Sequence, residues 1–366
     1  MKTIVLLLIF IIFLNPSEKS KLNNNWRKEI VGQYEGGWLY EVQIGDARNE
    51  GKNRIYVAGF DGWLIEWTYE NNKWSYNYFQ ISEKGKDKRL ICLWIGNGRN
   101  DGKNRIYASC VNGNLFEISF INGKWEKEII FSKGFLVSVG GEILHGDTLH
   151  HIYTGGYQTA LYELEYQNSK WNAKPVTKSN KRFHSRDIWA FAIGNGQNDG
   201  VKRIYCPEWG NNRIYEYSFE SNKFKENKIE MKNKTVKTEI GNVMGDNRNH
   251  LFVAEKFGHI YELNYHHEKG WSKTDIQPEA KNLSRYGLCI GNGRNDGKDR
   301  LYSVAQRGSI CEHNYENNKW SETTIDAISG ATVDCTLGNG RNDDTIRVYV
   351  PSVDGHLYEF TYIGNK

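Results

Sequence analysis

The chain has 366 residues; it is rich in aromatic side chains (13%) and glycine (37 residues) and poor in proline (5) and methionine (3). Its 48 Lys and Arg nearly balance its 44 Asp and Glu, and no long basic run occurs, so the charge pattern disfavours a nucleic-acid partner. Aromatic residues favour pleated strands and glycines favour tight turns, so the composition predicts an all-β chain.

An apolar run at residues 3–14 follows Lys2 at the start of the chain. The run is shorter than the roughly 20 residues that a membrane-spanning helix needs, and it is typical of the hydrophobic region of a signal peptide. We therefore expect residues 1–20 to be an export signal whose cleavage site the sequence does not define. The remaining chain, residues 21–366, is then secreted or extracytoplasmic, in the cell envelope. The alternative is an uncleaved anchor; no further membrane span is expected.

Three short patterns recur seven, seven and six times behind this segment. The first is a basic, an aliphatic and an aromatic residue; its aromatics are 46 to 52 residues apart and are Tyr56, Tyr107, Tyr153, Tyr205, Phe252, Tyr302 and Tyr349. The second ends on an acid: Glu66, Glu117, Glu163, Glu216, Glu262, Glu312 and Glu359. The third opens another strand with an aromatic: Trp74, Trp125, Trp171, Phe224, Trp271 and Trp320.

Each repeat reads as four short strands, which we name A to D in chain order. Seven four-stranded repeats at this spacing predict a seven-bladed β-propeller over residues 21–366. The last repeat stops after its strand C, whereas residues 26–31 look like a strand D with no strands before it, and Trp26 supplies the missing seventh aromatic. We therefore expect the N-terminal strand to close the last blade, which removes two free sheet edges.

Five repeats carry a long A–B loop, as in GNGRNDGKNR from Gly96. These loops resemble those of the FG-GAP/VCBS propeller family, which bind calcium through a D-x-[DN]-x-[DN]-G pattern, and Asp101-Gly102 matches the family's Asp-Gly. The resemblance implies calcium, but Arg99 and Arg105 stand at ligand positions, and an Arg offers only hydrogen-bond donors. We expect the guanidinium to replace the ion by binding Asp and backbone carbonyls. No cofactor is predicted, and calcium is the alternative.

Two other sets of residues have a structural and a functional interpretation. The Glu of each strand C faces the basic residue of strand B, which predicts cross-strand pairs that hold the register; the alternative is a ring of ligand carboxylates. His145, His150 and His151 form a histidine cluster in the short loop of the third repeat. We expect a structural role there and no metal site. The six cysteines have no fixed place in the repeat, and we interpret them as small buried side chains.

The D–A and B–C loops share the face of a propeller that usually binds ligands, and in this chain these loops vary while the A–B loops repeat. Aromatic rings beside arginines and acids on such a face suit a carbohydrate or a protein. The candidate ligand-binding residues are Phe60, Tyr157, His184, Arg186, Glu208, Trp209, Phe257, Arg285 and Arg307.

The sequence favours an exported, monomeric, non-catalytic binding module for a carbohydrate or a protein, because it contains no GxSxG, HExxH or GxxxxGK[ST] motif. The alternative is a propeller enzyme, such as a glycan lyase or a lactone hydrolase. That interpretation predicts acids or histidines converging at the channel mouth around His184, Arg186, Asp187, Glu208 and Arg285. A third possibility is a structural component of the envelope, and the fold alone does not choose among them.

Overall fold

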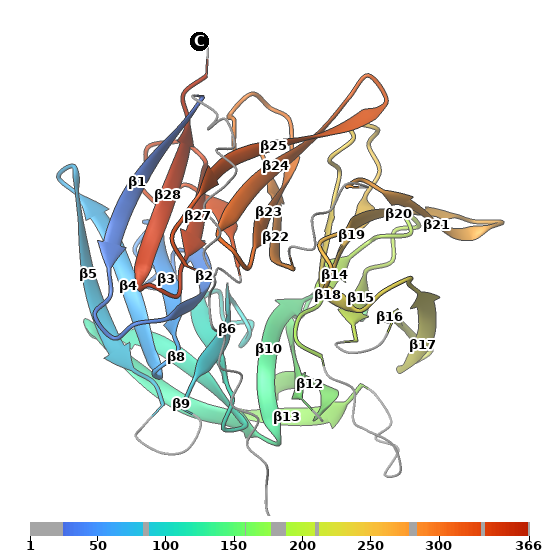
Figure 1. Cartoon of the computed structure of the whole chain (residues 1–366). Coiled ribbons are helices and arrows are strands. Elements are labelled where there is room, and N and C mark those ends of the chain that lie inside the picture. The colour runs from blue at the N-terminus through green and yellow to red at the C-terminus, as the bar shows by residue number, and fades with distance from the viewer. Residues whose placement is uncertain are drawn as a thin grey trace, which may run out of the picture.

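The computed structural model describes residues 25–82, 88–157, 159–176, 188–208, 212–277, 284–330 and 334–364. These residues form 28 strands and no helix, so the described part of the chain holds no helix able to cross a bilayer. The strands make seven antiparallel four-stranded sheets arranged in a ring (Figure 1). The chain is therefore a seven-bladed β-propeller, as predicted. The expected signal segment, residues 1–20, lies outside the described residues.

Blades 1 to 3 follow one another along the chain, each with strand A at the ring centre and strand D outermost (Figure 1). Blade 1 comprises β2 (Leu39–Gly45), β3 (Arg54–Gly59), β4 (Trp63–Glu70) and β5 (Lys73–Gln80). Blade 2 comprises β6 (Leu90–Gly96), β7 (Arg105–Cys110), β8 (Asn114–Ile121) and β9 (Lys124–Ser132). Blade 3 comprises β10 (Phe135–Glu142), β11 (His151–Tyr157), β12 (Thr159–Gln167) and β13 (Lys170–Pro175).

Blades 4 to 6 repeat this order. Blade 4 comprises β14 (Ala192–Gly194), β15 (Arg203–Pro207), β16 (Arg213–Glu220) and β17 (Lys223–Glu230). Blade 5 comprises β18 (Thr235–Gly241), β19 (His250–Glu255), β20 (Ile260–His266) and β21 (Gly270–Asp275). Blade 6 comprises β22 (Arg285–Gly291), β23 (Arg300–Ala305), β24 (Ser309–Glu316) and β25 (Lys319–Ala327).

Blade 7 joins the two ends of the described chain. Its inner strands are β26 (Thr336–Gly338), β27 (Arg347–Pro351) and β28 (His356–Tyr362), and its outermost strand is β1 (Trp26–Gln33). β1 runs antiparallel to β28, with Trp26 opposite Tyr362 and Gln33 opposite His356. The expectation that the N-terminal strand closes the last blade is confirmed.

One aromatic contact recurs between successive blades. The ring of Trp125 in β9 meets the ring of Tyr56 in the preceding blade edge to face, with centroids 5.9 Å apart and planes at 89°. The same contact is made by Tyr107–Trp171, Tyr153–Phe224, Tyr205–Trp271, Phe252–Trp320 and Tyr302–Trp26. Trp26 of β1 thus takes the place of the seventh aromatic, as the repeat predicts. Such pairs contribute roughly 0.5–1.5 kcal/mol beyond the area they bury.

The A–B loops are tied within their own blade by the arginine that opens strand B. In blade 2, Arg105 donates to both carboxylate oxygens of Asp101 at 2.8 and 2.6 Å and to the carbonyl oxygen of Lys103 at 3.2 Å. This is the tie through Asp and a backbone carbonyl that the sequence predicts. The pairs Asp199–Arg203, Asp296–Arg300 and Asp343–Arg347 repeat it.

The same loops also bind the next blade around the ring. Arg99 donates to the carboxylate of Glu117 at 3.0 Å, and its guanidinium lies 4.6 Å from the ring centroid of Tyr166 in blade 3. The side-chain amide of Asn100 donates to the carbonyl of His150 in blade 3 at 3.1 Å, and its oxygen accepts from the N–H of that residue at 2.7 Å. Arg99, Asn100 and Asp101 therefore each form hydrogen bonds within the protein.

The acid of each strand C lies inside its blade. Glu117 is 2% exposed, accepts a hydrogen bond from the hydroxyl of Tyr107 at 3.1 Å, and lies 3.7 Å from Nε of Arg105. The corresponding basic–acid pairs are Arg54–Glu66, Arg203–Glu216 and Arg347–Glu359. The predicted cross-strand pairing is therefore present. The cysteines are buried as well, except Cys92, which is partly exposed.

We predict that the Trp26 ring is required for closure of blade 7. Trp26→Ala removes a buried ring and its contacts with Tyr302 and Tyr362, which lowers the free energy of unfolding by about 3 kcal/mol. Urea denaturation measures the loss. Ile30→Ala on the same strand is the control, because Ile30 is 56% exposed. Equal, small losses for both variants would contradict this role of Trp26.

Acid should weaken the loop ties in a defined pH window. The hydrogen bonds from Arg105 lower the pKa of Asp101 from its usual 3.8 to about 2. Its ionised form therefore stabilises the fold above the usual pKa, and this contribution is lost as the pH falls through the lower, folded value. Asp101→Asn should lower the free energy of unfolding by about 0.5–1 kcal/mol at pH 7 and by progressively less below pH 4. Denaturation curves at several pH values, with exposed Lys103→Ala as the control, test this difference.

Candidate functional site

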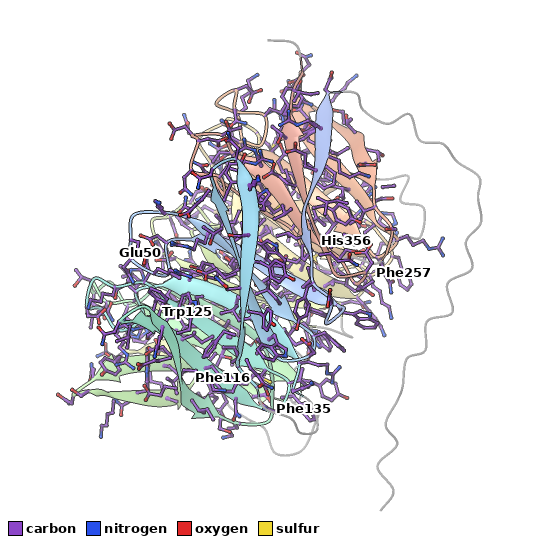
Figure 2. All side chains as sticks on the ribbon, turned by 90° about the vertical axis from the view of Figure 1, so that its left-hand side faces the viewer. Glu50, Phe116, Trp125, Phe135, Phe257 and His356 are labelled. Carbon is purple, nitrogen blue, oxygen red and sulfur yellow. The ribbon has the colours of Figure 1, made fainter. Side chains whose placement is uncertain are left out.

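The two ends of the ring differ in character. Figure 2 shows Glu50, in an A–B loop, on one side of the molecule and Phe135, Phe257 and His356 on the opposite side. That opposite side carries the D–A and B–C loops, and we call it the D–A/B–C face. Because the repeated A–B loops are occupied by ties within and between blades, the variable D–A/B–C face is the candidate site.

Phe60 lies at the centre of an aromatic cluster on this face. Its ring centroid is 4.8 Å from that of Trp38 and 6.1 Å from that of Tyr40, and the guanidinium of Arg89 lies 5.1 Å from it. The N–H of Phe60 donates to the carbonyl of Trp38 at 2.9 Å, which fixes the loop before β2 against the B–C turn. Trp38 is nevertheless 50% exposed. A large ring held this openly is available to a ligand.

This cluster has a buried apolar floor. Ile91, Val111 and Val137, from blades 2 and 3, are buried, and Tyr40, Phe60 and Trp189 pack against them. The set draws on blades 1 to 4 near the inner strands. The floor therefore holds the aromatic rings in place before any ligand arrives, which lowers the entropy cost of binding.

A second aromatic pair lies on blade 3. Tyr157 ends β11 and Phe135 begins β10; their centroids are 6.3 Å apart, and each ring is 42% exposed. The candidate residue Tyr157 thus joins an exposed pair that includes Phe135, which the sequence did not single out. The signal for Phe135 was its position at the first residue of strand A, beside a D–A loop.

The other candidate residues with exposed side chains are Phe257 and Arg307. They hold equivalent positions in the B–C turns of blades 5 and 6, and Phe257 is 49% exposed. His184, Arg186 and Trp209 lie outside the described residues. Phe257 and Arg307 belong to blades 5 and 6, whereas the Phe60 cluster draws on blades 1 to 4.

Arg285 and Glu208 turn inward. Arg285 is 3% exposed and donates to Oγ of Ser303 at 2.6 Å and to Glu322 at 3.0 Å, all within blade 6. Glu208 is 7% exposed, and its carboxylate lies 3.9 Å from Nε of Arg213. Both side chains are occupied by neighbours in their own blades.

A belt of charged side chains lies at the inner strands of blades 1, 5 and 7, and no pattern in the sequence singled it out. Lys237 of β18 has its ammonium 3.5 Å from the carboxylate of Asp334 and 3.9 Å from that of Glu239. Glu41 of β2 accepts a hydrogen bond from the thiol of Cys92 at 3.3 Å. The detectable signal was a charged residue at a strand-A position that holds Cys92, Ser138 or Ala190 in other blades.

The belt has strongly perturbed acid–base properties. Burial, with the charge of Asp334 added, raises the pKa of Glu41 to about 7. Burial likewise raises the pKa of Glu239 to about 7. Burial opposes the charge on Lys237, but Asp334, Glu239 and Glu41 outweigh it and raise the pKa of this ammonium. Two carboxyl groups can therefore exchange protons near neutral pH, while one ammonium stays charged.

Comparisons with known proteins are consistent with the fold and go no further. No protein-family model matches the chain, and no curated protein matches it. Among solved structures it is similar to BBS1N in a crystal structure of BBS1N in complex with ARL6DN, soaked with lead. That match has a TM-score of 0.63 and 10% identity and covers 93% of this chain and 98% of the other. The mercury-soaked crystal gives a TM-score of 0.63 at 11% identity, covering 93% and 97%. Identity this low shows the fold alone.

Glu41 should make the stability of the chain pH-dependent. Its folded pKa of about 7 exceeds the usual 4.5, so the folded state favours the neutral acid and loses stability as the pH rises between these values. The side chain in Glu41→Gln stays neutral, so the variant should become more stable than the wild type as the pH rises over this range. Its free energy of unfolding should exceed that of the wild type by on the order of 1 kcal/mol at pH 8. Thermal denaturation from pH 5 to 8 tests this, with exposed Glu35→Gln as the control. A gain that does not change with pH would contradict the assignment.

Proposed function

We propose that this chain is a non-catalytic binding propeller that holds a protein partner on its D–A/B–C face. The observation that carries the proposal is the set of exposed aromatic rings there, Trp38, Phe135, Tyr157 and Phe257, each 42–50% exposed. Exposed aromatic rings beside an arginine over a packed apolar floor are typical of the central part of protein interfaces.

Two further points support a protein rather than a carbohydrate ligand. The aromatic rings are spread over blades 1, 3 and 5, which suits a broad contact more than a small pocket. The similar structure, BBS1N, was crystallised in complex with a protein, ARL6DN. That likeness supports the class of ligand and says nothing of which residues bind.

We also propose that the chain acts as a monomer outside the cytoplasm and that binding at this face needs no cofactor. The support for export is the apolar run at residues 3–14 behind Lys2. Cell fractionation and N-terminal sequencing of the recovered protein test export. Recovery of the full-length chain from the cytoplasm would contradict it.

The binding proposal is tested by crosslinking from defined positions. A photo-crosslinking amino acid at Tyr157 should capture the partner, whereas the same group at Tyr78 should not, because Tyr78 is 59% exposed on the outer strand β5. With the purified partner, Trp38→Ala and Tyr157→Ala should each raise Kd at least tenfold, about 1.4 kcal/mol. Tyr78→Ala should change Kd less than twofold.

Each result has a defined meaning. Unchanged Kd for Trp38→Ala and Tyr157→Ala would overturn the assignment of the face. A glycan array supplies the second arm: glycan binding that Trp38→Ala abolishes would keep the face and replace the protein by a carbohydrate. If neither protein binding nor glycan binding changes when these rings are removed, the site lies elsewhere on the chain.

A second candidate function rests on the charged belt. Glu41 and Glu239, with pKa values of about 7, have the properties of general acids and bases at neutral pH. This favours the enzyme alternative, such as a glycan lyase or a lactone hydrolase, over a purely structural role. Product formation from such substrates, lost in Glu41→Gln and Glu239→Gln, would support it; no turnover across pH 5 to 8 would exclude these two reaction classes.

A further inference from the structure

Blade 3 lacks the arginine that neutralises the buried acid of strand C in other blades. In four blades a guanidinium from the A–B loop contacts that acid: Arg48–Glu66, Arg99–Glu117, Arg294–Glu312 and Arg341–Glu359. The A–B loop of blade 3 is shorter, and His145 in this loop takes the arginine's place. The ring of His145 stacks on Phe219 of blade 4 at 3.6 Å, as the guanidinium of Arg99 lies over Tyr166.

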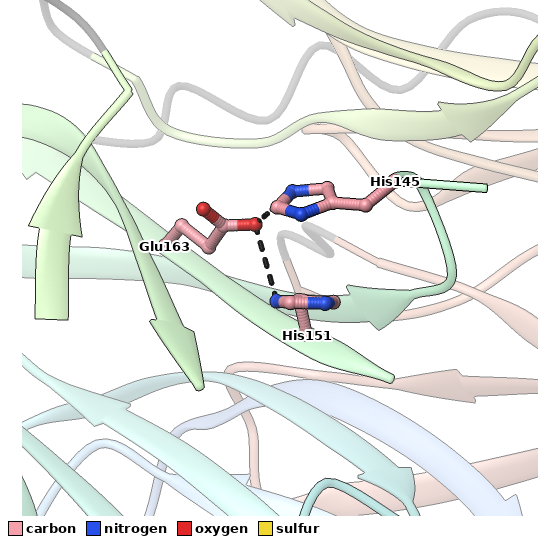
Figure 3. Close-up of side chains that lie close together, drawn as sticks. All are labelled: His145, His151 and Glu163. Carbon is pink, nitrogen blue, oxygen red and sulfur yellow. Dashed lines mark ion pairs between the residues drawn. The ribbon is translucent and has the colours of Figure 1, made fainter. Parts of the chain in front are cut away.

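Two imidazoles converge on one carboxylate oxygen in this blade (Figure 3). Nδ1 of His151 lies 3.2 Å from Oε1 of Glu163, and Nε2 of His145 contacts the same oxygen. The three possible ligand atoms lie within 4.8 Å of one another. Glu163 is 0% exposed, His151 1% and the side chain of His145 10%. The group is therefore enclosed, and solvent contacts it through His145.

The nitrogens that face the carboxylate are not satisfied by hydrogen bonds. Among the described residues, neither Nδ1 of His151 nor Nε2 of His145 has a hydrogen-bond partner of good geometry, although both lie close to the acid. The other nitrogen of His151 lies 3.4 Å from the carboxylate of Asp147. A carboxylate behind a histidine is the arrangement that orients metal-bound imidazoles.

We propose that His145, His151 and Glu163 bind one divalent transition-metal ion, with zinc as the ion that best suits two imidazoles and a carboxylate. The ion supplies the positive charge that a loop arginine supplies in blades 1, 2, 6 and 7. Lys174, 2.9 Å from the second oxygen of Glu163, neutralises that oxygen. The first oxygen accepts one hydrogen bond, from the hydroxyl of Tyr153 at 3.0 Å, and keeps a lone pair for the metal. From the sequence, the histidines were expected to have a structural role and to bind no metal; Glu163, distant in sequence, completes the proposed set.

Blade 5 provides a natural control inside the same chain. His250 lies 2.9 Å from Glu262 and 3.1 Å from Asp246, which repeats the His151 arrangement. Met244 stands where blade 3 has His145. The two blades differ in the second imidazole, and also where blade 5 has Thr274 in place of Lys174 and Phe252 in place of Tyr153. The fold already accepts a methionine at the position of His145.

Zinc binding to the full-length chain, stripped with EDTA and then titrated by calorimetry, tests the proposal. The wild type should bind one zinc ion, and His145→Met should weaken binding at least 100-fold while remaining folded by circular dichroism. Met244→His combined with Thr274→Lys, which restores the cation beside the acid, should add a second ion. Cobalt substitution should give the absorption of a tetrahedral site in the wild type and not in His145→Met.

Three results would overturn the proposal. They are the absence of stoichiometric zinc in the wild type, equal affinity in His145→Met, and a chain with both Met244→His and Thr274→Lys that still binds only one ion. The last result would show that a second imidazole beside a His–Glu pair does not create the site. None of these results depends on the partner-binding face, so the two proposals fail separately.

Discussion

The edge-to-face contact between an aromatic of strand D and the aromatic of strand B in the preceding blade is the interaction on which the ring depends. A single four-stranded sheet cannot bury its faces alone, so each blade must pack against two neighbours. In this chain the contact recurs with centroids 5.8 to 6.3 Å apart and nearly perpendicular planes. Because every blade needs a partner on each side, the contact between Trp26 and Tyr302, which holds the N-terminal strand against blade 6, is what turns a row of sheets into a closed ring.

The A–B loops form a second, polar layer of the same construction. Arg99 reaches its own blade's acid and the next blade's tyrosine, Asn100 binds the next blade's backbone, and Asp101 holds the arginine of strand B. A loop whose side chains are all engaged in this way has little freedom to vary. The loops of the D–A/B–C face do not repeat these ties, so their sequences can differ from blade to blade.

The architecture was predictable because each blade follows from short sequence patterns that repeat along the chain. The closing strand was predictable too, because Trp26 completes the series of strand-D aromatics. The site was only partly predictable. Arg285 was expected at the rim because it is charged, but it stands at the strand-A position that holds Leu39, Leu90 and Leu136 in other blades, and it is buried as they are. The Lys237–Asp334 pair of the belt joins residues from separate blades, and no local pattern shows which inner strands meet across the ring.

The pairing of β1 with β28 has a consequence for how the chain comes to be folded. A ribosome makes residues 26–33 early and residues 356–362 more than 300 residues later, yet these two segments must lie side by side in one sheet. Until β28 exists, β1 has no partner, and blades 1 and 6 each keep an uncovered flank. The ring can therefore be completed only after synthesis of β28, and the nascent chain carries open sheet edges that neighbouring chains or chaperones can meet first.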